Sequence, residues 1–234
     1  TDNDGVKLYI DGVPIGTVAT NGVVGGLANS TEPLFIGSRT GGTLDHFSGL
    51  IDDVRLYNRA LSDTEVTELY ELEKPEEVPL SNGLVAYYPF NGNPDNVAGE
   101  GNAGTLIGAP QLVTDRFGKQ GSAYELDGNN DYIDGGNPVE NNPAVITQSA
   151  WIKTTATENH PNGDLPILTK RHTNDGSDWP TIVLDARTGN VIVWADDRGG
   201  VGGQGGGIRW PELVIDVRDG EWHHVVGIKD GTNC

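Results

Sequence analysis

Short runs in which apolar and polar residues alternate constrain the fold of this chain most. They occur at residues 6–10, 181–184, 190–194 and 224–228. Alternation with a period of two places successive side chains on opposite faces of a β-strand. Asp11-Gly12, Thr188-Gly189-Asn190 and Asp230-Gly231 border these runs and supply the positive φ that tight hairpins require. The pattern predicts antiparallel strands joined by short turns.

Composition agrees with this class and excludes several functions. The 234 residues suffice for one large domain or two small ones, and 34 glycines and 13 prolines favour many turns, so we predict an all-β protein. With 15 basic and 34 acidic residues the formal charge is −19, which excludes nucleic-acid binding. No stretch approaches the roughly 18 apolar residues of a membrane span, so no membrane insertion is expected. The chain begins at Thr1, and we expect it to be part of a longer protein.

One segment departs from the strand pattern. Ser62 and Glu65 form an S-x-x-E capping box, and Val66, Leu69, Tyr70 and Glu73 follow at helical spacing. We therefore expect one short helix near residues 62–73. Residues 74–79 contain two prolines and three charged residues without periodicity, which is typical of an extended linker. The linker, taken as residues 74–83, separates a segment 1–73 from a segment 84–234.

Both segments contain motifs that resemble a laminin-G-like, or concanavalin A-like, lectin and glucanase family. Residues 84–90, 101–106, 126–133, 150–153 and 219–226 resemble the N-terminal half of such a domain. Residues 6–12, 35–37 and 48–62 resemble its C-terminal half. The resemblance implies a jelly roll, a two-sheet antiparallel sandwich, with its halves in reversed order along this chain.

The reversed order leaves two possibilities open for how the sandwich is completed. The linker can close one permuted domain within the chain, because the ends of a jelly roll lie close together. Alternatively each half completes a neighbouring chain, which would give a head-to-tail polymer built by strand addition. The single cysteine, Cys234, excludes an internal disulfide.

A calcium ion is the strongest cofactor prediction. Strict alternation in residues 50–56 would place Asp52 on the same face as Leu50, Val54 and Leu56, and a carboxylate on a core face needs a compensating cation. The resemblance places the loops around Asp95 and Asn102 beside that strand, so we predict Asp52, Asp95 and Asn102 as ligands. The alternative is that Asp52 accepts backbone hydrogen bonds and Asp95 caps a turn.

Carbohydrate stacking on aromatic rings is the second candidate chemistry. Trp151 and Trp222 lie within family motifs, and we interpret them as core residues. Trp179, Trp194 and Trp210 lie near turns and are the candidates for an exposed ligand platform, although tryptophans near turns also serve in packing.

Catalysis is not expected. Glucanases that the chain resembles carry an E-x-D-x-x-E strand, and none occurs here; Asp185 stands alone in its strand. His223 and His224 are adjacent on a predicted strand, so they face opposite ways and are poorly placed to share zinc.

The resemblance and these residues together predict a non-catalytic, calcium-stabilised carbohydrate-binding or adhesion module. We expect it at the cell surface or outside the cell, within a repeat-containing surface protein, with a glycan or a surface protein as partner. The alternative is a structural subunit that polymerises head to tail by sharing half-domains. A glycan hydrolase is the third and weakest hypothesis.

Overall fold

A large antiparallel sheet forms the front layer of the computed structural model, which describes residues 5–19, 33–39, 45–71, 81–98, 103–138, 145–157, 164–169, 181–194 and 215–230. Strand β4 (Ser48–Tyr57) is central, since β10 (Ile146–Lys153) pairs along one side and both β8 (Ala123–Asp127) and β5 (Leu84–Tyr88) pair along the other. Beyond β10 follow β14 (Trp222–Asp230), β1 (Gly5–Ile10) and β2 (Val13–Ala19), and beyond β8 follows β7 (Gln111–Val113).

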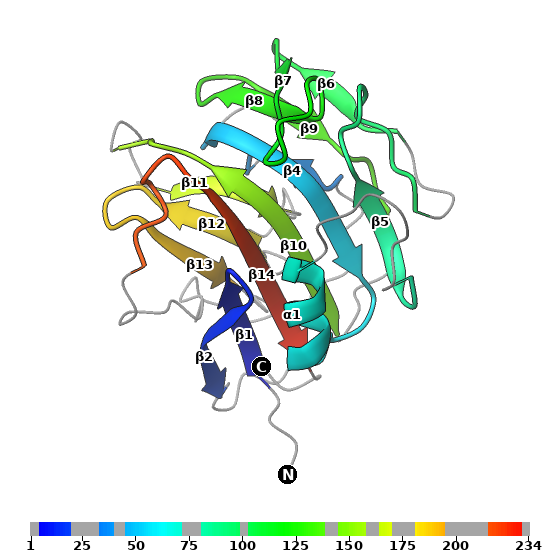
Figure 1. Ribbon diagram of the computed structural model, residues 1–234, viewed down its shortest axis with the longest axis vertical. Coiled ribbons are helices and arrows are strands. Elements are labelled where there is room, and N and C mark those ends of the chain that lie inside the picture. The colour runs from blue at the N-terminus through cyan, green and yellow to red at the C-terminus, as the bar shows by residue number, and fades with distance from the viewer. Residues whose placement is uncertain are drawn as a thin grey trace, which may run out of the picture.

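A smaller antiparallel sheet lies behind the first (Figure 1). Its strands are, in spatial order, β13 (Asn190–Trp194), β12 (Thr181–Asp185), β11 (Asp164–Thr169), β3 (Phe35–Ile36), β9 (Tyr132–Asp134) and β6 (Thr105–Ile107). Two antiparallel sheets packed face to face with one helix among the described residues confirm the predicted sandwich class.

Strands from the two sides of the linker are interleaved in both sheets. In the large sheet β1 pairs with β14, and β4 lies between β10 and the strands β8 and β5. In the small sheet β3 lies between β11 and β9. The strands of segment 1–73 thus pair mainly with strands of segment 84–234, so neither segment forms either complete sheet alone.

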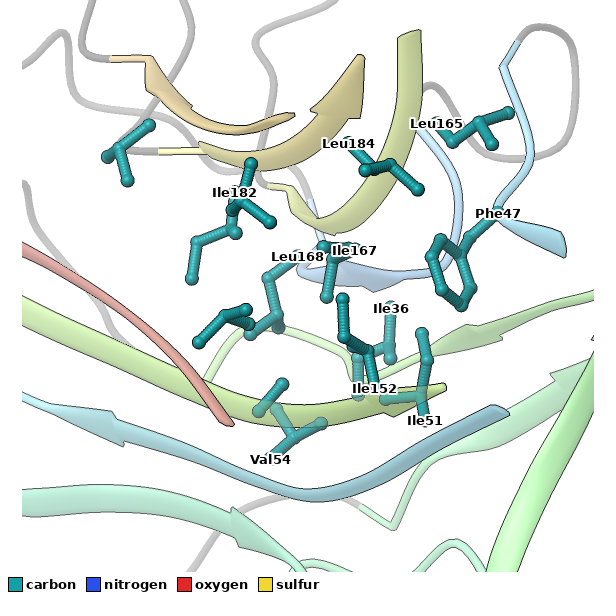
Figure 2. Packing of buried hydrophobic residues seen from close by; sticks show 14 of the residues in the cluster. Ile36, Phe47, Ile51, Val54, Ile152, Leu165, Ile167, Leu168, Ile182 and Leu184 are labelled. Carbon is teal, nitrogen blue, oxygen red and sulfur yellow. The ribbon is translucent and has the colours of Figure 1, made fainter. Parts of the chain in front are cut away.

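The main core fills the space between the sheets (Figure 2). Ile51, Val54 and Ile152 of the large sheet face residues of the small sheet that include Ile36, Ile167 and Ile182. These six side chains are fully buried. Full burial of an aliphatic side chain contributes about 1.5–3 kcal/mol each, which makes this layer the main source of stability.

Helix α1 (Asp63–Glu71) covers part of the outer face of the large sheet (Figure 1). The predicted capping box is present: the Ser62 N–H donates to Glu65 Oε2 at 2.9 Å and the Glu65 N–H donates to Ser62 Oγ at 3.3 Å. A second apolar cluster lies under the helix, formed by Val66 and Leu69 with Tyr9, Tyr57, Leu61, Val226 and Ile228. The helix therefore needs the sheet to bury its apolar face.

The predicted turns are confirmed where the structure describes them. Asp11 and Gly12 join β1 to β2 with φ values of 51° and 73°, and Gly189 lies between β12 and β13 with φ 78°.

Most of the predicted linker, Cys234 and the glycine-rich residues 199–207 lie outside the described residues. The described part of the chain contains no helix with the length and apolar character of a membrane span.

Candidate functional site

A β-bulge in β4 decides where Asp52 lies. Asp53 has φ 48°, and the pairing of β4 with β10 shifts register between Ser149 and Trp151. As a result Ile51 and Val54, three positions apart, both face the main core, while Asp52 pairs with Trp151 on the outer face. The prediction that Asp52 shares the face of Val54 and Leu56 is wrong, because it assumed uninterrupted alternation.

Arg116 supplies the positive charge that the buried Asp52 requires. Its Nη1 lies 2.9 Å from Asp52 Oδ2, and its Nη2 contacts the carboxylate of Asp53. Asp52 Oδ1 accepts the Asp53 N–H at 2.8 Å. Asp53 also accepts the Tyr87 hydroxyl at 2.7 Å and lies 3.7 Å from Arg55. Two guanidinium groups and two carboxylates thus form one buried network.

The two carboxylates of this network differ electrostatically. Burial, together with the charge of Asp53, raises the pKa of Asp52 despite the neighbouring Arg116. Burial would also raise the pKa of Asp53, but Arg55 and Arg116 lower it below its usual range. Negative charge therefore concentrates on Asp53, where two guanidinium groups hold it.

This network does not fit Asp52 as a calcium ligand. Both of its carboxylate oxygens are already engaged, and Arg116 would repel a divalent cation at the same oxygens. Asp95 is exposed in a turn in which its N–H donates to Asn93 Oδ1 at 3.0 Å, whereas Asn102 lies outside the described residues. Among the described residues no group of three or more His, Cys, Asp or Glu could hold a metal ion. A calcium site involving Asp95 and Asn102 stays a prediction.

Aromatic and basic side chains stack over this network on the outer face. Trp151 lies 5.6 Å from the Tyr70 ring of α1 and 5.1 Å from the His224 ring, and both contacts are stacked. Arg116 lies 4.7 Å from the Trp151 ring and 4.2 Å from the Phe117 ring. Trp151 is therefore a packing residue beside α1, but it is only partly buried, so the expectation of a buried core residue is wrong. Trp222, which pairs with Lys153, is also only partly buried.

The adjacent histidines occupy opposite environments, as the strand pattern predicts. The ring nitrogens of His223 lie 3.0 Å from Asp11 and 3.0 Å from Asp219, and these partners raise its pKa to about 9 although burial opposes the rise. His224 is fully buried, and burial, followed by the charges of Arg55 and Arg116, lowers its pKa to about 3. One ring is thus held charged and the other neutral, which does not fit a shared zinc ion.

The three candidate ligand-binding tryptophans are only partly placed. Trp194 ends β13, an edge strand of the small sheet, but its side chain lies outside the described part of the chain. Trp179 and Trp210 lie outside the described residues altogether. Their role as a ligand platform stays a prediction.

A carboxylate pair exists that inspection of single strands missed. Asp185 of β12 lies directly opposite Asp164 of β11. Arg187 lies 3.0 Å from Asp185, and Arg39 bridges Asp164 at 3.1 Å and Asp45 at 2.9 Å. Each carboxylate is thus engaged by an arginine side chain, whereas glycoside hydrolysis requires a carboxyl group placed to donate a proton to the leaving group. The pair therefore fits an ion-pair network better than an acid and base couple; only knowledge of the strand register could have revealed it.

The two antiparallel sheets define a β-sandwich. Residues 1–67, which contain β1 to β4 and the first residues of α1, match a laminin-G-type family model described as the concanavalin A-like lectin/glucanases superfamily. The resemblance inferred from the sequence is thereby confirmed over this segment. No curated protein and no solved structure matches the chain significantly.

Proposed function

We propose that this chain is a non-catalytic carbohydrate-binding or adhesion module that works outside the cell. The observation that carries the proposal is the match of residues 1–67 to the concanavalin A-like superfamily, in a chain whose described strands form that kind of two-sheet sandwich. Domains of this type commonly bind carbohydrate or mediate adhesion and are generally found outside cells. The guanidinium-paired carboxylates support binding over hydrolysis.

The ligand platform belongs to this proposal. Trp179, Trp194 and Trp210 would offer their rings to sugar faces, since an aromatic ring provides a large apolar surface. The test is binding of the purified chain to an array of immobilised glycans, repeated with all three tryptophans changed to alanine. Loss of binding in the variant supports the platform, and unchanged binding of every glycan contradicts it. Trp151→Phe is the matched control, because Trp151 is held between Tyr70 and Arg116.

Structural calcium is a separate part of the proposal. The negative charge of the chain favours bound cations, and Asp95 carries an exposed carboxylate in a loop. Thermal unfolding in millimolar calcium and in excess chelator tests it. A calcium site at Asp95 predicts a higher melting temperature in calcium than in chelator. This difference should disappear in Asp95→Asn and persist in Asp52→Asn, if Asp52 is not a ligand. Equal melting temperatures in calcium and chelator would exclude structural calcium.

Polymerisation by half-domain sharing is tested by native mass. Within one chain β1 already pairs with β14 over residues 5–10 and 225–230. We therefore expect a monomer near 24.9 kDa across a hundredfold concentration range. A ladder of multiples that persists on dilution would instead support the structural-subunit hypothesis.

A further inference from the structure

An open cavity of about 770 Å³ lies where the start of β4 meets the end of β8 and the turn that follows β6. This volume falls within the usual range of small-molecule sites. Strand β7 and residues 155–156 complete its wall. None of the described residues that line it was predicted from the sequence as a ligand-binding or metal-binding residue.

Two aspartates of the cavity wall are held by backbone amides. Asp127 Oδ1 accepts the N–H groups of Asn129, Asn130 and Asp131 at 2.8–3.3 Å, and Asp131 Oδ1 accepts the Ala109 N–H at 2.6 Å. Burial would raise the pKa of Asp127, but these backbone donors lower it, so this carboxylate is charged at neutral pH. The wall is therefore preorganised and negatively charged before any ligand arrives.

Glu125 differs from these two aspartates because it is available to a ligand. Its side chain is exposed, and it makes no hydrogen bond or ion pair with any described residue. Gln111 lies directly opposite it on β7 and donates its Nε2 to the Ala109 carbonyl at 2.7 Å, which leaves the side-chain carbonyl oxygen of Gln111 as an acceptor. The two side chains place acceptors side by side at the cavity wall.

The lining determines which ligand charge fits. Three carboxylates, Glu125, Asp127 and Asp131, face the cavity together with amide and hydroxyl side chains, and the described residues of its lining include no Lys, no Arg and no aromatic ring. An anionic ligand would be repelled here, while a ligand rich in hydroxyl and ammonium donors would find acceptors. The absence of an aromatic ring also means that hydrogen bonds and charge, and not stacking, would provide affinity.

We propose that this cavity binds the amino-sugar units of an oligosaccharide, with the ammonium group on Glu125 and sugar hydroxyls on Gln111 and Asn130. The inference rests on the proposed carbohydrate-binding function and names its ligand class. Because a charge-assisted hydrogen bond is stronger than a neutral one, the cavity prefers a free amino sugar to its N-acetylated form and excludes uronic acids.

Calorimetric titration of the chain with three tetrasaccharides tests the inference. The first is built from glucosamine, the second from N-acetylglucosamine and the third from galacturonic acid. We expect the glucosamine probe to bind roughly tenfold more tightly than the N-acetylated probe, and the galacturonate probe not to bind. Glu125→Gln should weaken glucosamine binding about tenfold and change N-acetylglucosamine binding little. Glu68→Gln is the matched control, since it removes the same charge from an exposed position on α1. Thr155→Lys, at an exposed cavity position, should abolish glucosamine binding.

Each contrary result has a distinct meaning. Galacturonate binding as tight as glucosamine binding would overturn the charge selectivity, and therefore the inference. Saccharide binding that neither Glu125→Gln nor Thr155→Lys alters would place the ligand elsewhere and overturn the cavity site alone, leaving the proposed function intact. Binding of no saccharide in this test and on the glycan array would overturn both. Binding of a tetralysine peptide without any saccharide would likewise overturn the inference and identify a basic protein segment as the ligand.

Discussion

Arg116 Nη1 lies 2.9 Å from Asp52 Oδ2, and the two side chains are only 8% and 3% exposed. This ion pair ties the loop between β7 and β8 to the bulge of the central strand β4. The same guanidinium stacks on Trp151, which in turn contacts the helix through Tyr70. A single buried side chain therefore connects a loop, the large sheet and α1.

Arg116→Ala should destabilise the fold by about 3–5 kcal/mol, because it leaves the two buried carboxyl groups of Asp52 and Asp53 with Arg55 as their remaining basic partner. The free energy of unfolding in urea measures the loss. The double variant Arg116→Ala, Asp52→Asn should recover part of it. Lys7→Ala is the control, since Lys7 pairs with the exposed Asp63 and its loss should cost less than about 1 kcal/mol. Equal losses from Arg116→Ala and Lys7→Ala would contradict this role.

His223 should make the protein less stable in alkaline solution. Asp11 and Asp219 raise its pKa from 6.5 to about 9, so the folded state holds the proton more tightly than the unfolded state. The stabilisation is complete below pH 6.5 and disappears as the pH rises through about 9. The free energy of unfolding, measured between pH 6.5 and about 9, should therefore fall in the native protein. The variant His223→Gln should not show this fall. An NMR titration that gave His223 an unshifted pKa would refute the prediction.

His224 should act in the opposite direction in acid. Burial lowers its pKa from 6.5 to about 3, so the unfolded state binds the proton more tightly. Stability should therefore fall as the pH drops from 6.5 toward 3, because unfolding lets the ring take up a proton. In His224→Phe, which keeps an aromatic ring beside Trp151, we expect this part of the acid sensitivity to disappear. If the stability of the native protein and of His224→Phe fell equally with decreasing pH, groups other than His224 would control the acid sensitivity.

Gly108→Ala should destabilise the turn beside the cavity by about 3 kcal/mol. Its φ is +79°, and an added Cβ would lie 2.2 Å from Asp131 Oδ1 and 2.8 Å from the Asn130 carbonyl oxygen. Gly118→Ala is the matched control: its φ is +83°, but nothing lies within 4 Å, so only the backbone term of about 1 kcal/mol remains. Thermal unfolding of both variants provides the comparison. Similar losses of stability in the two variants would show that the close contact of the added Cβ with Asp131 does not destabilise the protein further.

Local patterns predicted the elements of the fold well. The alternating runs became β1, β12, β13 and β14, the S-x-x-E motif begins α1, and Asp11-Gly12 forms the first hairpin turn. These features depend on neighbouring residues, whose conformational preferences are expressed in the sequence itself. The bulge at Asp53 was missed because its signal lies in the mismatch between β4 and β10, which comes from a distant segment.

The functional residues were harder to predict for the same reason. The pairing of Asp52 with Arg116 joins residues 64 positions apart, and the pairing of Asp164 with Asp185 depends on strand register. The cavity beside Glu125 is assembled from β4, β7, β8 and three loop segments. Sequence spacing cannot report such proximity, because nothing in the local pattern specifies which distant side chains meet.

The sequence by itself determined that this protein consists mainly of antiparallel strands, with a short helix after Ser62 and a strongly negative net charge, since alternation, turn residues, capping and charge are local properties. Only the tertiary structure decided that the guanidinium of Arg116 lies against Asp52. It also decided that Trp151 stacks on Tyr70 of the helix and that Glu125 lies exposed beside a cavity. The physical reason is that burial and charge compensation are properties of the assembled surroundings of a side chain, and a bulge of one residue is enough to change them.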